Sequence, residues 1–357
     1  MRILTVIGAR PQFIKACPVS LSFKESGIEE LLLHTGQHYD SQMSNVFFEE
    51  LSLPKPYKNL KINGGTHGQM TGRMLTEIEK ELIHQRPDLV LVYGDTNSTL
   101  AGALAAVKLK IPIVHIEAGL RSFNSQMPEE TNRILTDRIS SYLFCPTRIA
   151  VENLNSEGIV EHVHEVGDVM YDSSLMMAER AEDRSSIIKD LVLEKEQFIL
   201  ATVHRAENTD DNSRLQNILE VLSELNTKTK VIFPIHPRTR SIISKHFSSS
   251  VLNDINVIDP VSYFDIIALQ RSAQLIITDS GGMQKEAYFY KVPCVTLRDE
   301  TEWVETVDSK WNTLMSPEFK IDADNIERKM NRSRPPWTML YGDGNAAKKI
   351  TSVLKQI

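Results

Sequence analysis

An α/β fold with two Rossmann-like domains is the architecture that the sequence predicts. Short apolar runs rich in β-branched residues alternate with longer amphipathic stretches, which is typical of parallel strands connected by helices. This alternation occurs twice, with a polar helical stretch between the two series. A chain of 357 residues is also longer than a single hydrophobic core normally supports, so two domains are expected.

The two series predict a first domain over residues 1–171, a second over 172–343, and a final helix over 344–357 that packs back on the first domain. The amphipathic stretches predict helices, for example at 67–85 and 98–108. Strands of the first domain are predicted at 2–8, 30–35, 88–94, 111–116, 142–145 and 163–166. Those of the second domain are predicted at 198–203, 230–235, 256–258, 274–278 and 293–297.

Composition and charge limit the classes of function. A hydrophobic content of 41% and a charged content of 24% are ordinary for a soluble enzyme. The formal net charge of -7, without any basic block, predicts no nucleic-acid partner. No apolar stretch approaches the length of a membrane span, so no membrane association is expected. Cys17, Cys145 and Cys294 form no metal or disulfide pattern, which predicts no metal site and suits the reducing cytoplasm.

The first motif, GARPQFIK at residues 8–15, directly follows the first predicted strand. Gly8 permits a tight turn, and Pro11 suits the start of a helix. Arg10 and Lys15 are then candidates for binding phosphate or carboxylate, although two ordinary surface cations are an equally good interpretation. Because the motif is not G-x-G-x-x-G, no nicotinamide or flavin cofactor is expected.

Two carboxylates follow strands of the first domain. The motif YGDTNST places Asp95 at the carboxyl end of an apolar strand, and EAGLR places Glu117 at the end of another. Asp95 could be a helix N-cap, but the hydroxyls beside it can cap equally well, which leaves Asp95 for other work. Ligands of open α/β sheets bind beyond the carboxyl ends of strands, so both carboxylates are predicted to face one crevice.

The helix after EAGLR begins with PEETNR, in which the proline suits a first helical position. Glu129 and Glu130 fall in the first turn, and Glu129 shares a helix face with Arg133. A solvated helix start with an i,i+4 ion pair is the structural alternative. That alternative accounts for Glu130, but it does not account for Glu117 or Arg121.

Two strand ends of the second domain carry histidines. VHRAEN places His204 at the tip of a strand, and HPRTR places His236 at the end of the next. A lone histidine is more often structural, but facing domains would bring His204 opposite the carboxylates of the first domain. His162 and His164 alternate along a strand without metal partners and are interpreted as ordinary.

DSGGMQKEA predicts a diphosphate site in the second domain. A strand ends at Asp279, and Ser280, Gly281 and Gly282 open a helix whose free amides can bind a diphosphate at close range. Glu286 lies one turn later, where it could accept hydrogen bonds from ribose hydroxyls. A plain glycine-rich turn is the alternative, but the coincidence of serine, two glycines and a downstream glutamate favours a ligand site.

Taken together, these motifs resemble the non-hydrolysing UDP-N-acetylglucosamine 2-epimerase family. The match extends over nearly the whole chain, through GARPQFIK, TGQH at 35–38, GDTNST, EAGLR, PEETNR, VHRAEN and DSGGMQKEA. It implies two domains in the glycosyltransferase-B arrangement, with a UDP-sugar in the interdomain cleft, and a cytoplasmic homodimer. It implies catalytic roles for Asp95, Glu117, Glu129 and His204. It implies substrate binding by Arg10, Lys15, Arg133, His236, Ser280, Gly281, Gly282 and Glu286.

The resemblance also implies a reaction, the cofactor-independent conversion of UDP-N-acetylglucosamine to UDP-N-acetylmannosamine. Inversion at C2 of an N-acetyl sugar cannot use an adjacent ketone. A workable route eliminates UDP to leave a 2-acetamidoglycal, and then adds UDP back with a proton delivered to the opposite face of C2. Glu117 and Glu129 would exchange the C2 proton with help from Asp95, and His204 would protonate or neutralise the leaving phosphate.

Some segments depart from the pattern of the family. DETEWVETV at 299–307 replaces a TERPE-like stretch, and QHYD at 37–40 replaces the QHRQ of members that their own substrate activates, so such activation is not expected. Trp303 and the loop SFNSQMPEE are similar to relatives that act on modified sugars. UDP-2,3-diacetamido-2,3-dideoxyglucuronate or a UDP-6-deoxy-N-acetylhexosamine therefore remains an alternative substrate.

Two other classes of function were weighed. A glycosyltransferase of the same fold would need an acceptor site rather than three clustered carboxylates. A nucleotide-sugar-binding protein would tolerate the loss of Asp95 or Glu117, and both are present.

Overall fold

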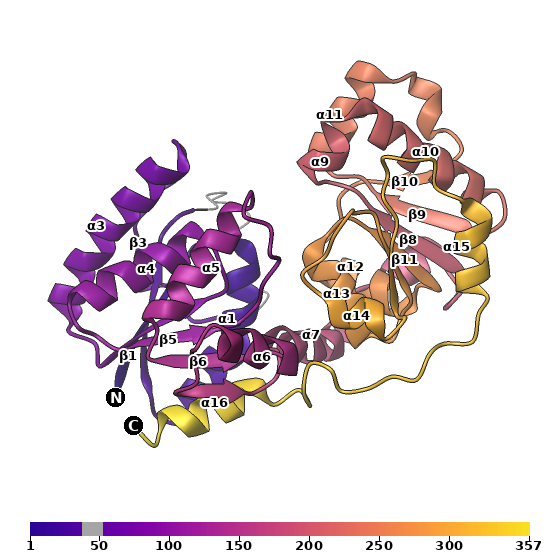
Figure 1. Cartoon of the computed structure of the whole chain (residues 1–357). Helices are drawn as coiled ribbons and strands as arrows, with labels where there is room; N and C mark the ends of the chain where they lie inside the picture. Colours follow the sequence, from indigo (N-terminus) through magenta and orange to yellow (C-terminus); the bar gives the residue numbers. More distant parts are fainter. Residues whose placement is uncertain (38–52) are drawn as a thin grey trace. The chain divides into compact units, whose positions relative to one another are not determined.

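The computed structural model describes residues 1–37 and 53–357. The chain divides into two compact units, which are shown in Figure 1. The first unit comprises Met1–Leu175 together with Met339–Ile357, and the second comprises Met176–Thr338. The predicted α/β class with two parallel sheets is confirmed, because each unit contains one such sheet with helices packed on it.

The sheet of the first unit has seven parallel strands over the described residues, in the order β3-β2-β1-β4-β5-β6-β7. The strands are β1 (Arg2–Ile7), β2 (Glu29–His34), β3 (Lys58–Asn59), β4 (Leu89–Tyr93), β5 (Ile113–Ile116), β6 (Tyr142–Cys145) and β7 (Val163–Glu165). The strand order reverses between β1 and β4, and in such sheets ligands bind at the carboxyl ends beside this switch point.

Helices pack on the first sheet and bury its apolar side chains. Leu4 and Val6 of β1 join Val90 and Val92 of β4 in one hydrophobic cluster with residues of α3 and α4. Because side chains alternate along a strand, the intervening residues of β1 face the other side of the sheet. The helices are α1 (Arg10–Glu25), α3 (His67–Gln85), α4 (Asn97–Lys108), α5 (Pro128–Ile139), α6 (Arg148–Ser156), α7 (Val169–Arg184) and α16 (Ala346–Leu354).

The second unit repeats the same plan. Its sheet has six parallel strands, in the order β10-β9-β8-β11-β12-β13. The strands are β8 (Phe198–Thr202), β9 (Lys230–Pro234), β10 (Asn256–Ile258), β11 (Leu275–Thr278), β12 (Cys294–Thr296) and β13 (Asn312–Leu314). The helices are α8 (Ile187–Asp190), α9 (Ala206–Thr209), α10 (Asn212–Asn226), α11 (Pro237–His246), η1 (Ser249–Leu252), α12 (Tyr263–Ser272), α13 (Gly281–Phe289), α14 (Val304–Asp308) and α15 (Ala323–Met330).

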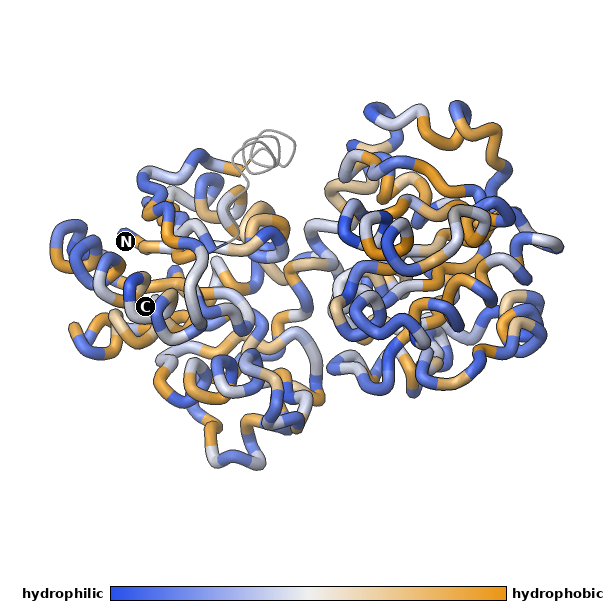
Figure 2. The backbone as a smooth tube through the Cα atoms, turned by 90° about the horizontal axis from the view of Figure 1, so that it is seen from above, coloured by the Kyte–Doolittle hydropathy of each residue, from blue (hydrophilic) through white to orange (hydrophobic). Residues whose placement is uncertain are grey.

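Strand β8 shows how the second sheet is buried on both faces. Ile199 and Ala201 belong to one hydrophobic cluster, whereas Phe198 and Leu200 belong to another. Figure 2 shows hydrophobic stretches running through the interior of each unit. Burial on both faces explains why these strands are continuous apolar runs in the sequence.

The predicted helices at 67–85 and 98–108 agree with α3 and α4 to within one residue. The prediction missed the edge strands β3 and β13. β3 has two residues, both exposed, and β13 has three, so neither shows an apolar pattern that a sequence could reveal.

Helix α1 continues through Pro18, which lacks an amide hydrogen. The carbonyl of Ile14, four residues earlier, therefore loses its normal helical donor. The hydroxyl of Ser173 in α7 donates to this carbonyl instead. The bond compensates for the proline and connects α7 to the helix that carries the GARPQFIK motif.

The C-terminal helix α16 lies against α1 in the first unit (Figure 1). The hydroxyl oxygens of Ser22 and Thr351 are 2.7 Å apart. The carboxylate of Asp172 accepts hydrogen bonds from the amides of Ala346 (3.1 Å) and Ala347 (2.8 Å). Asp172 thus satisfies two of the free amides at the start of α16.

Replacing Asp172 with alanine should loosen α16. We expect a loss of about 1–2 kcal/mol in the free energy of α16 docking, because two buried amides lose their acceptor. Amide hydrogen exchange over residues 344–357 should accelerate accordingly. Asp183→Ala, at an exposed position on α7, is the control and should leave this protection unchanged. Equal exchange in both variants would contradict the anchoring role of Asp172.

Candidate active site

The candidate catalytic residues of the first unit follow neighbouring strands. Gly8 follows β1, Gly94 and Asp95 follow β4, and Glu117 follows β5. β4 pairs with both β1 and β5. The two predicted carboxylates therefore lie at adjacent strand ends, beside the switch point of the sheet.

Glu117 is held in an unusual backbone conformation. Its φ is 70°, in the left-handed region that residues other than glycine seldom adopt. Its carboxylate forms an ion pair with Lys15, and the two side chains are 7% and 12% exposed. A Cβ atom at Gly94 would lie 2.9 Å from Oε2 of Glu117, so the glycine leaves room for this carboxylate. Strained, buried and charged groups of this kind are concentrated at functional sites.

Asp95 is fixed by the helix α5. Its carboxylate lies 2.5 Å from a guanidinium nitrogen of Arg133, and its carbonyl accepts a hydrogen bond from Asn132 at 2.9 Å. Burial raises the pKa of Asp95, and the charge of Glu117 adds to this, while Arg133 opposes it. A carboxyl group with a raised pKa is suited to exchange protons near neutral pH.

The N-cap of α4 is Thr96, whose side chain accepts a hydrogen bond from the amide of Thr99. This confirms that a neighbouring hydroxyl, and not Asp95, caps the helix.

The two glutamates in the first turn of α5 differ in burial. Glu130 is 4% exposed and accepts hydrogen bonds from the amides of Ser122 (2.9 Å) and Phe123 (3.0 Å). The interpretation of Glu130 as a solvated residue is therefore wrong, because it holds the loop before α5. Arg133 pairs with Glu130 at 2.9 Å, at a spacing of i,i+3. The side chain of Glu129 is exposed and makes no ion pair or hydrogen bond within the described residues, so its carboxylate is accessible.

Gln12 joins the turns after β1 and β4, and the sequence analysis did not identify it. Its carbonyl oxygen accepts hydrogen bonds from the amides of Gly8 (2.8 Å) and Ala9 (3.0 Å). Its amide nitrogen donates to the carbonyl of Tyr93 (2.9 Å) and the hydroxyl of Thr96 (3.0 Å). The sequence offers one signal of this role, a glutamine at the third position of the helix, where its side chain can accept from the amide before the helix.

Gly8 is required for space and not for a left-handed turn. Its φ is not in the positive region, but a Cβ atom there would lie 2.1 Å from both the hydroxyl of Ser98 and that of Thr35. Those two hydroxyl oxygens are 2.8 Å apart and hydrogen-bonded.

Gly8→Ala should therefore destabilise the first unit by about 1–3 kcal/mol, because the methyl group displaces both hydroxyls. The free energy of unfolding from urea titration measures this loss. Gly72→Ala in α3 is the matched control, since no other atom lies within 4 Å of its Cβ position. A Gly8→Ala protein as stable as the Gly72→Ala protein would contradict the steric account.

Arg10 is the first residue of α1 and is exposed, while Lys15 is one turn further along the same helix. The substrate-binding roles of Arg10, Lys15 and Arg133 remain predictions. Residues 38–40 of the TGQH and QHYD motifs, including His38, lie outside the described residues.

In the second unit, Asp279 fixes the position of His204. The Nδ1 atom of His204 lies 3.0 Å from Oδ1 of Asp279. Asp279 is fully buried and also accepts hydrogen bonds from the amides of His204 (3.0 Å) and Arg205 (2.9 Å). The His204 side chain is 44% exposed, so its other ring nitrogen can reach a ligand.

His236 is the N-cap of α11, and its Nδ1 accepts a hydrogen bond from the amide of Arg238 at 3.2 Å. The rings of His204 and His236 have centroids 6.0 Å apart. The structure therefore places the two predicted histidines together at the ends of adjacent strands.

The predicted diphosphate site lies at the start of α13. Ser280 is the N-cap and accepts a hydrogen bond from the amide of Met283, while Gly281 and Gly282 form the first turn. Amides of a first turn have no acceptor within the helix and can bind an anion. A Cβ atom at Gly281 would lie 2.9 Å from a carboxylate oxygen of Glu302, so a side chain does not fit there.

Two further side chains of this region are buried. Glu286 is 6% exposed, and one of its carboxylate oxygens accepts a hydrogen bond from Gln270 at 2.9 Å. Its predicted contact with ribose hydroxyls remains a prediction. Trp303 is also buried, and the ammonium group of Lys285 lies 3.7 Å from the centre of its ring. Trp303 therefore packs inside the second unit.

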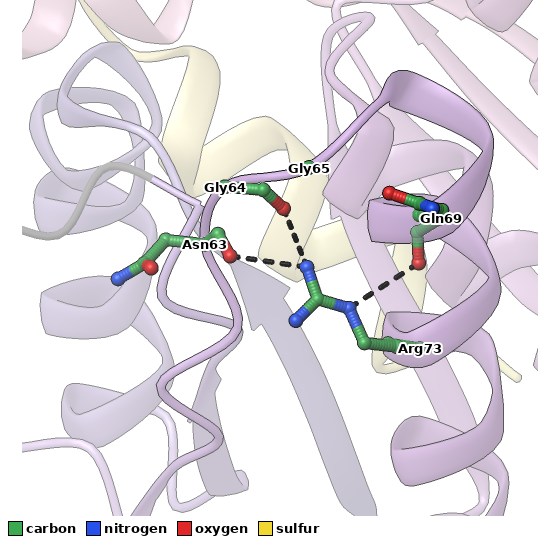
Figure 3. A pocket seen from close by; sticks show the side chains of 5 residues that line it. All are labelled: Asn63, Gly64, Gly65, Gln69 and Arg73. Carbon is green, nitrogen blue, oxygen red and sulfur yellow. Dashed lines mark hydrogen bonds between the residues drawn. The ribbon is translucent and has the colours of Figure 1, made fainter.

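A separate pocket of about 580 Å³ lies in the first unit and is lined by Asn63, Gly64, Gly65, Gln69 and Arg73 (Figure 3). The Arg73 guanidinium donates to the carbonyls of Asn63 (3.0 Å), Gly64 (2.5 Å) and Gln69 (3.4 Å). Because this cation is used to fix the loop before α3, the pocket supplies no obvious anion site.

Within the part of the chain that the structure describes, no group of three or more His, Cys, Asp or Glu residues could hold a metal ion. Cys17, Cys145 and Cys294 are buried, and burial raises the pKa of the Cys294 thiol to about 12. None of the described helices has the length and apolar character of a membrane span.

Comparison with known proteins agrees with these features. The family model for UDP-N-acetylglucosamine 2-epimerase matches residues 22–355. A UDP-N-acetylglucosamine 2-epimerase homolog of Methanococcus maripaludis is 51% identical, and the match covers 100% of both chains. UDP-2,3-diacetamido-2,3-dideoxy-D-glucuronate 2-epimerase of Pseudomonas aeruginosa is 50% identical, again over 100% of both chains.

A solved structure supports the same relationship. The crystal structure of Methanocaldococcus jannaschii UDP-GlcNAc 2-epimerase in complex with UDP-GlcNAc and UDP matches with a TM-score of 0.89 and 42% identity. This match also covers 100% of both chains. The sequence motifs, the two sheets and these end-to-end matches lead to one conclusion: the chain belongs to the UDP-N-acetylglucosamine 2-epimerase family.

Proposed function

We propose that this isomerase interconverts UDP-N-acetylglucosamine and UDP-N-acetylmannosamine by removing and replacing the proton on C2. The observation that carries the proposal is the pair of carboxylates at the ends of β4 and β5, Asp95 and Glu117, in a chain of this family. Each carboxylate has its own cationic partner, Arg133 or Lys15. Such an arrangement keeps two acids close together without leaving a buried charge unpaired.

The reaction proceeds by elimination and addition. A carboxylate removes the C2 proton, a C1=C2 double bond forms, and the C1–O bond breaks so that its electron pair leaves with UDP. UDP then adds back to C1 while a second acid delivers a proton to the opposite face of C2. Glu117 and Glu129 are the pair that exchanges this proton, and Asp95 assists.

The second unit binds the leaving group. The free amides of the first turn of α13 bind the diphosphate, and Ser280 caps that turn. His204, oriented by Asp279, neutralises or protonates the departing phosphate. Arg10, His236 and Glu286 complete the proposed contacts with the nucleotide.

A modified sugar is the second candidate substrate. The Pseudomonas aeruginosa relative is named for UDP-2,3-diacetamido-2,3-dideoxy-D-glucuronate and matches this chain from end to end. We also propose that the protein is a cytoplasmic homodimer. Sedimentation equilibrium would measure the mass of this assembly.

The test is to incubate the protein with UDP-N-acetylglucosamine and follow the anomeric and C2 proton signals by NMR. New signals of UDP-N-acetylmannosamine at constant total UDP-sugar are expected. Release of free UDP and N-acetylmannosamine would instead indicate a hydrolysing enzyme. A parallel incubation uses UDP-2,3-diacetamido-2,3-dideoxyglucuronate. Inversion at C2 of this sugar, but not of UDP-N-acetylglucosamine, would make it the substrate. No reaction with either sugar would overturn the proposed activity.

A further inference from the structure

A cluster of polar and charged side chains, formed by His115, Asp137, Arg121 and Glu157, connects to the strand ends that carry the proposed catalytic carboxylates, and three of its four members are buried. His115 is in β5, two residues before Glu117, and Asp137 is in the last turn of α5. The side chains of His115 and Asp137 are fully buried, and that of Arg121 is 1% exposed. No member of this cluster has a role in the reaction proposed above.

His115 bridges two groups through its ring nitrogens. Its Nε2 atom is 2.8 Å from the carbonyl oxygen of Gly94, and its Nδ1 atom is 2.7 Å from Oδ1 of Asp137. A carbonyl oxygen can only accept a hydrogen bond, so Nε2 must carry a proton. Oδ2 of Asp137 accepts hydrogen bonds from Arg121 (2.7 Å) and the amide of Gly119 (3.1 Å), so both carboxyl oxygens of Asp137 are engaged.

Arg121 connects the buried part of the cluster to its exposed edge. Its guanidinium donates to Oδ2 of Asp137 at 2.7 Å and to both carboxylate oxygens of Glu157, whose side chain is 33% exposed. Asp137 is therefore contacted by the imidazole of His115 at one oxygen and by the guanidinium of Arg121 at the other.

The cluster contacts the backbone on both sides of the proposed site. His115 donates to the carbonyl of Gly94, the residue before Asp95, while Asp137 accepts from Gly119, two residues after Glu117. Helix α5, which carries Asp137, also holds Asp95 through Arg133. The two strand ends are therefore connected through the same buried pair of side chains, His115 and Asp137.

We propose that His115 is a positioning residue, which donates to the carbonyl of Gly94 and is hydrogen-bonded to Asp137, so that Asp95 is held at a fixed distance from Glu117. The proposal rests on the proposed function, because its purpose is to place the groups that exchange the C2 proton. A displacement of about 1 Å in such groups can lower the rate about 10²-fold.

Two substitutions separate the contacts of His115. The amide nitrogen of His115→Asn occupies the place of Nδ1, so it retains the bond to Asp137 and loses the bond to Gly94. The amide nitrogen of His115→Gln occupies the place of Nε2, so it retains the bond to Gly94. Both remove the imidazole ring, and they form a matched pair. His162→Asn is the control, since this histidine is exposed in the same unit and its φ of 52° is one that asparagine tolerates.

The experiment measures kcat and KM per folded protein and determines crystal structures of both His115 variants. We expect His115→Asn to lower kcat about 10²-fold with little change in KM, and His115→Gln to recover most of that loss. In the crystal, Asp95 should leave Arg133 in the asparagine variant and keep this contact in the glutamine variant. A purely structural role would lower the stability of both variants alike and leave kcat per folded protein unchanged.

The outcomes distinguish this inference from the proposed function. A wild-type protein that does not epimerise any of the tested sugars would overturn the function, while the crystal structures would still decide the positioning role. An active wild type with an equally active His115→Asn protein, or Asp95 unmoved in its crystal structure, would overturn the positioning role alone.

Discussion

Glu117→Gln should lower kcat by about 10²–10⁴-fold, the range typical for the loss of a general acid or base. The glutamine amide has the same shape and can still accept a hydrogen bond from Lys15, but it cannot take up or release a proton. Folding should be intact, because the strained backbone at φ 70° and the space left by Gly94 are unchanged. Initial rates of C2 inversion by NMR measure the effect.

The control for this substitution is Glu161→Gln, at an exposed position of the same unit. It removes the same charge without touching the candidate site, so its kcat should equal that of the wild type. Turnover by Glu117→Gln within about twofold of this control would remove Glu117 from the mechanism.

Asp279→Asn should weaken the second unit and misplace His204. An asparagine cannot accept hydrogen bonds at both terminal atoms, so donors from His204, Arg205 or Asn208 are left without a partner. Each buried donor that is left without an acceptor costs about 1–3 kcal/mol. We therefore expect a lower urea midpoint and a fall in kcat, because the His204 ring loses the oxygen that orients it.

The stability difference should depend on pH. Burial alone would raise the pKa of Asp279, but hydrogen bonds from the His204 ring and from backbone amides lower it below its ordinary value of 3.8. A carboxylate with a lowered pKa stabilises the folded state above the unfolded pKa, and the contribution is lost as the pH falls through the folded pKa.

The wild type should accordingly exceed Asp279→Asn in stability above about pH 4, and the two should converge at lower pH. The free energy of unfolding measured by urea titration between pH 2 and pH 7 would show this, in steps of roughly one unit. Asp308→Asn, an exposed substitution in the same unit, should follow the wild type at every pH. A constant difference between wild type and Asp279→Asn would show that the ionised carboxylate is not the source of the stability.

The position of the site was predictable because it depends on strand ends. A buried parallel strand is a short apolar run, and the polar residue that ends it marks the carboxyl edge of the sheet. This rule predicts positions at strand ends for Asp95, Glu117 and His204, and the structure places them there, while their catalytic roles remain predictions. Their placement needs only the local sequence and the general rule for α/β sheets.

Other features depend on contacts between distant segments. Gln12 bonds to Tyr93, and His115 bonds to Asp137, and no periodicity in the sequence connects these residues. The interpretation of Glu130 as a solvated residue was wrong for a similar reason, since Glu130 is buried. Adjacent residues of a helix differ by roughly 100° in direction, and the path of the loop at Ser122 decides which of the two is covered.

One departure from the family pattern, at Trp303, also depends on packing between distant residues. Trp303 was interpreted as a sign of a modified sugar, and the structure shows its ring packed against Lys285. A substitution in a binding motif can therefore reflect packing inside a unit, and substrate assays must decide between the two candidate sugars.

The central claim is that the enzyme breaks and remakes the C2–H bond with carboxylates of the first unit. The most direct measurement is turnover of UDP-N-acetylglucosamine in deuterium oxide, with NMR and mass spectrometry of both epimers. Deuterium should enter C2 of the product and of the recovered substrate with the wild type, and far more slowly with Glu117→Gln. Inversion at C2 with the original hydrogen retained would contradict the account.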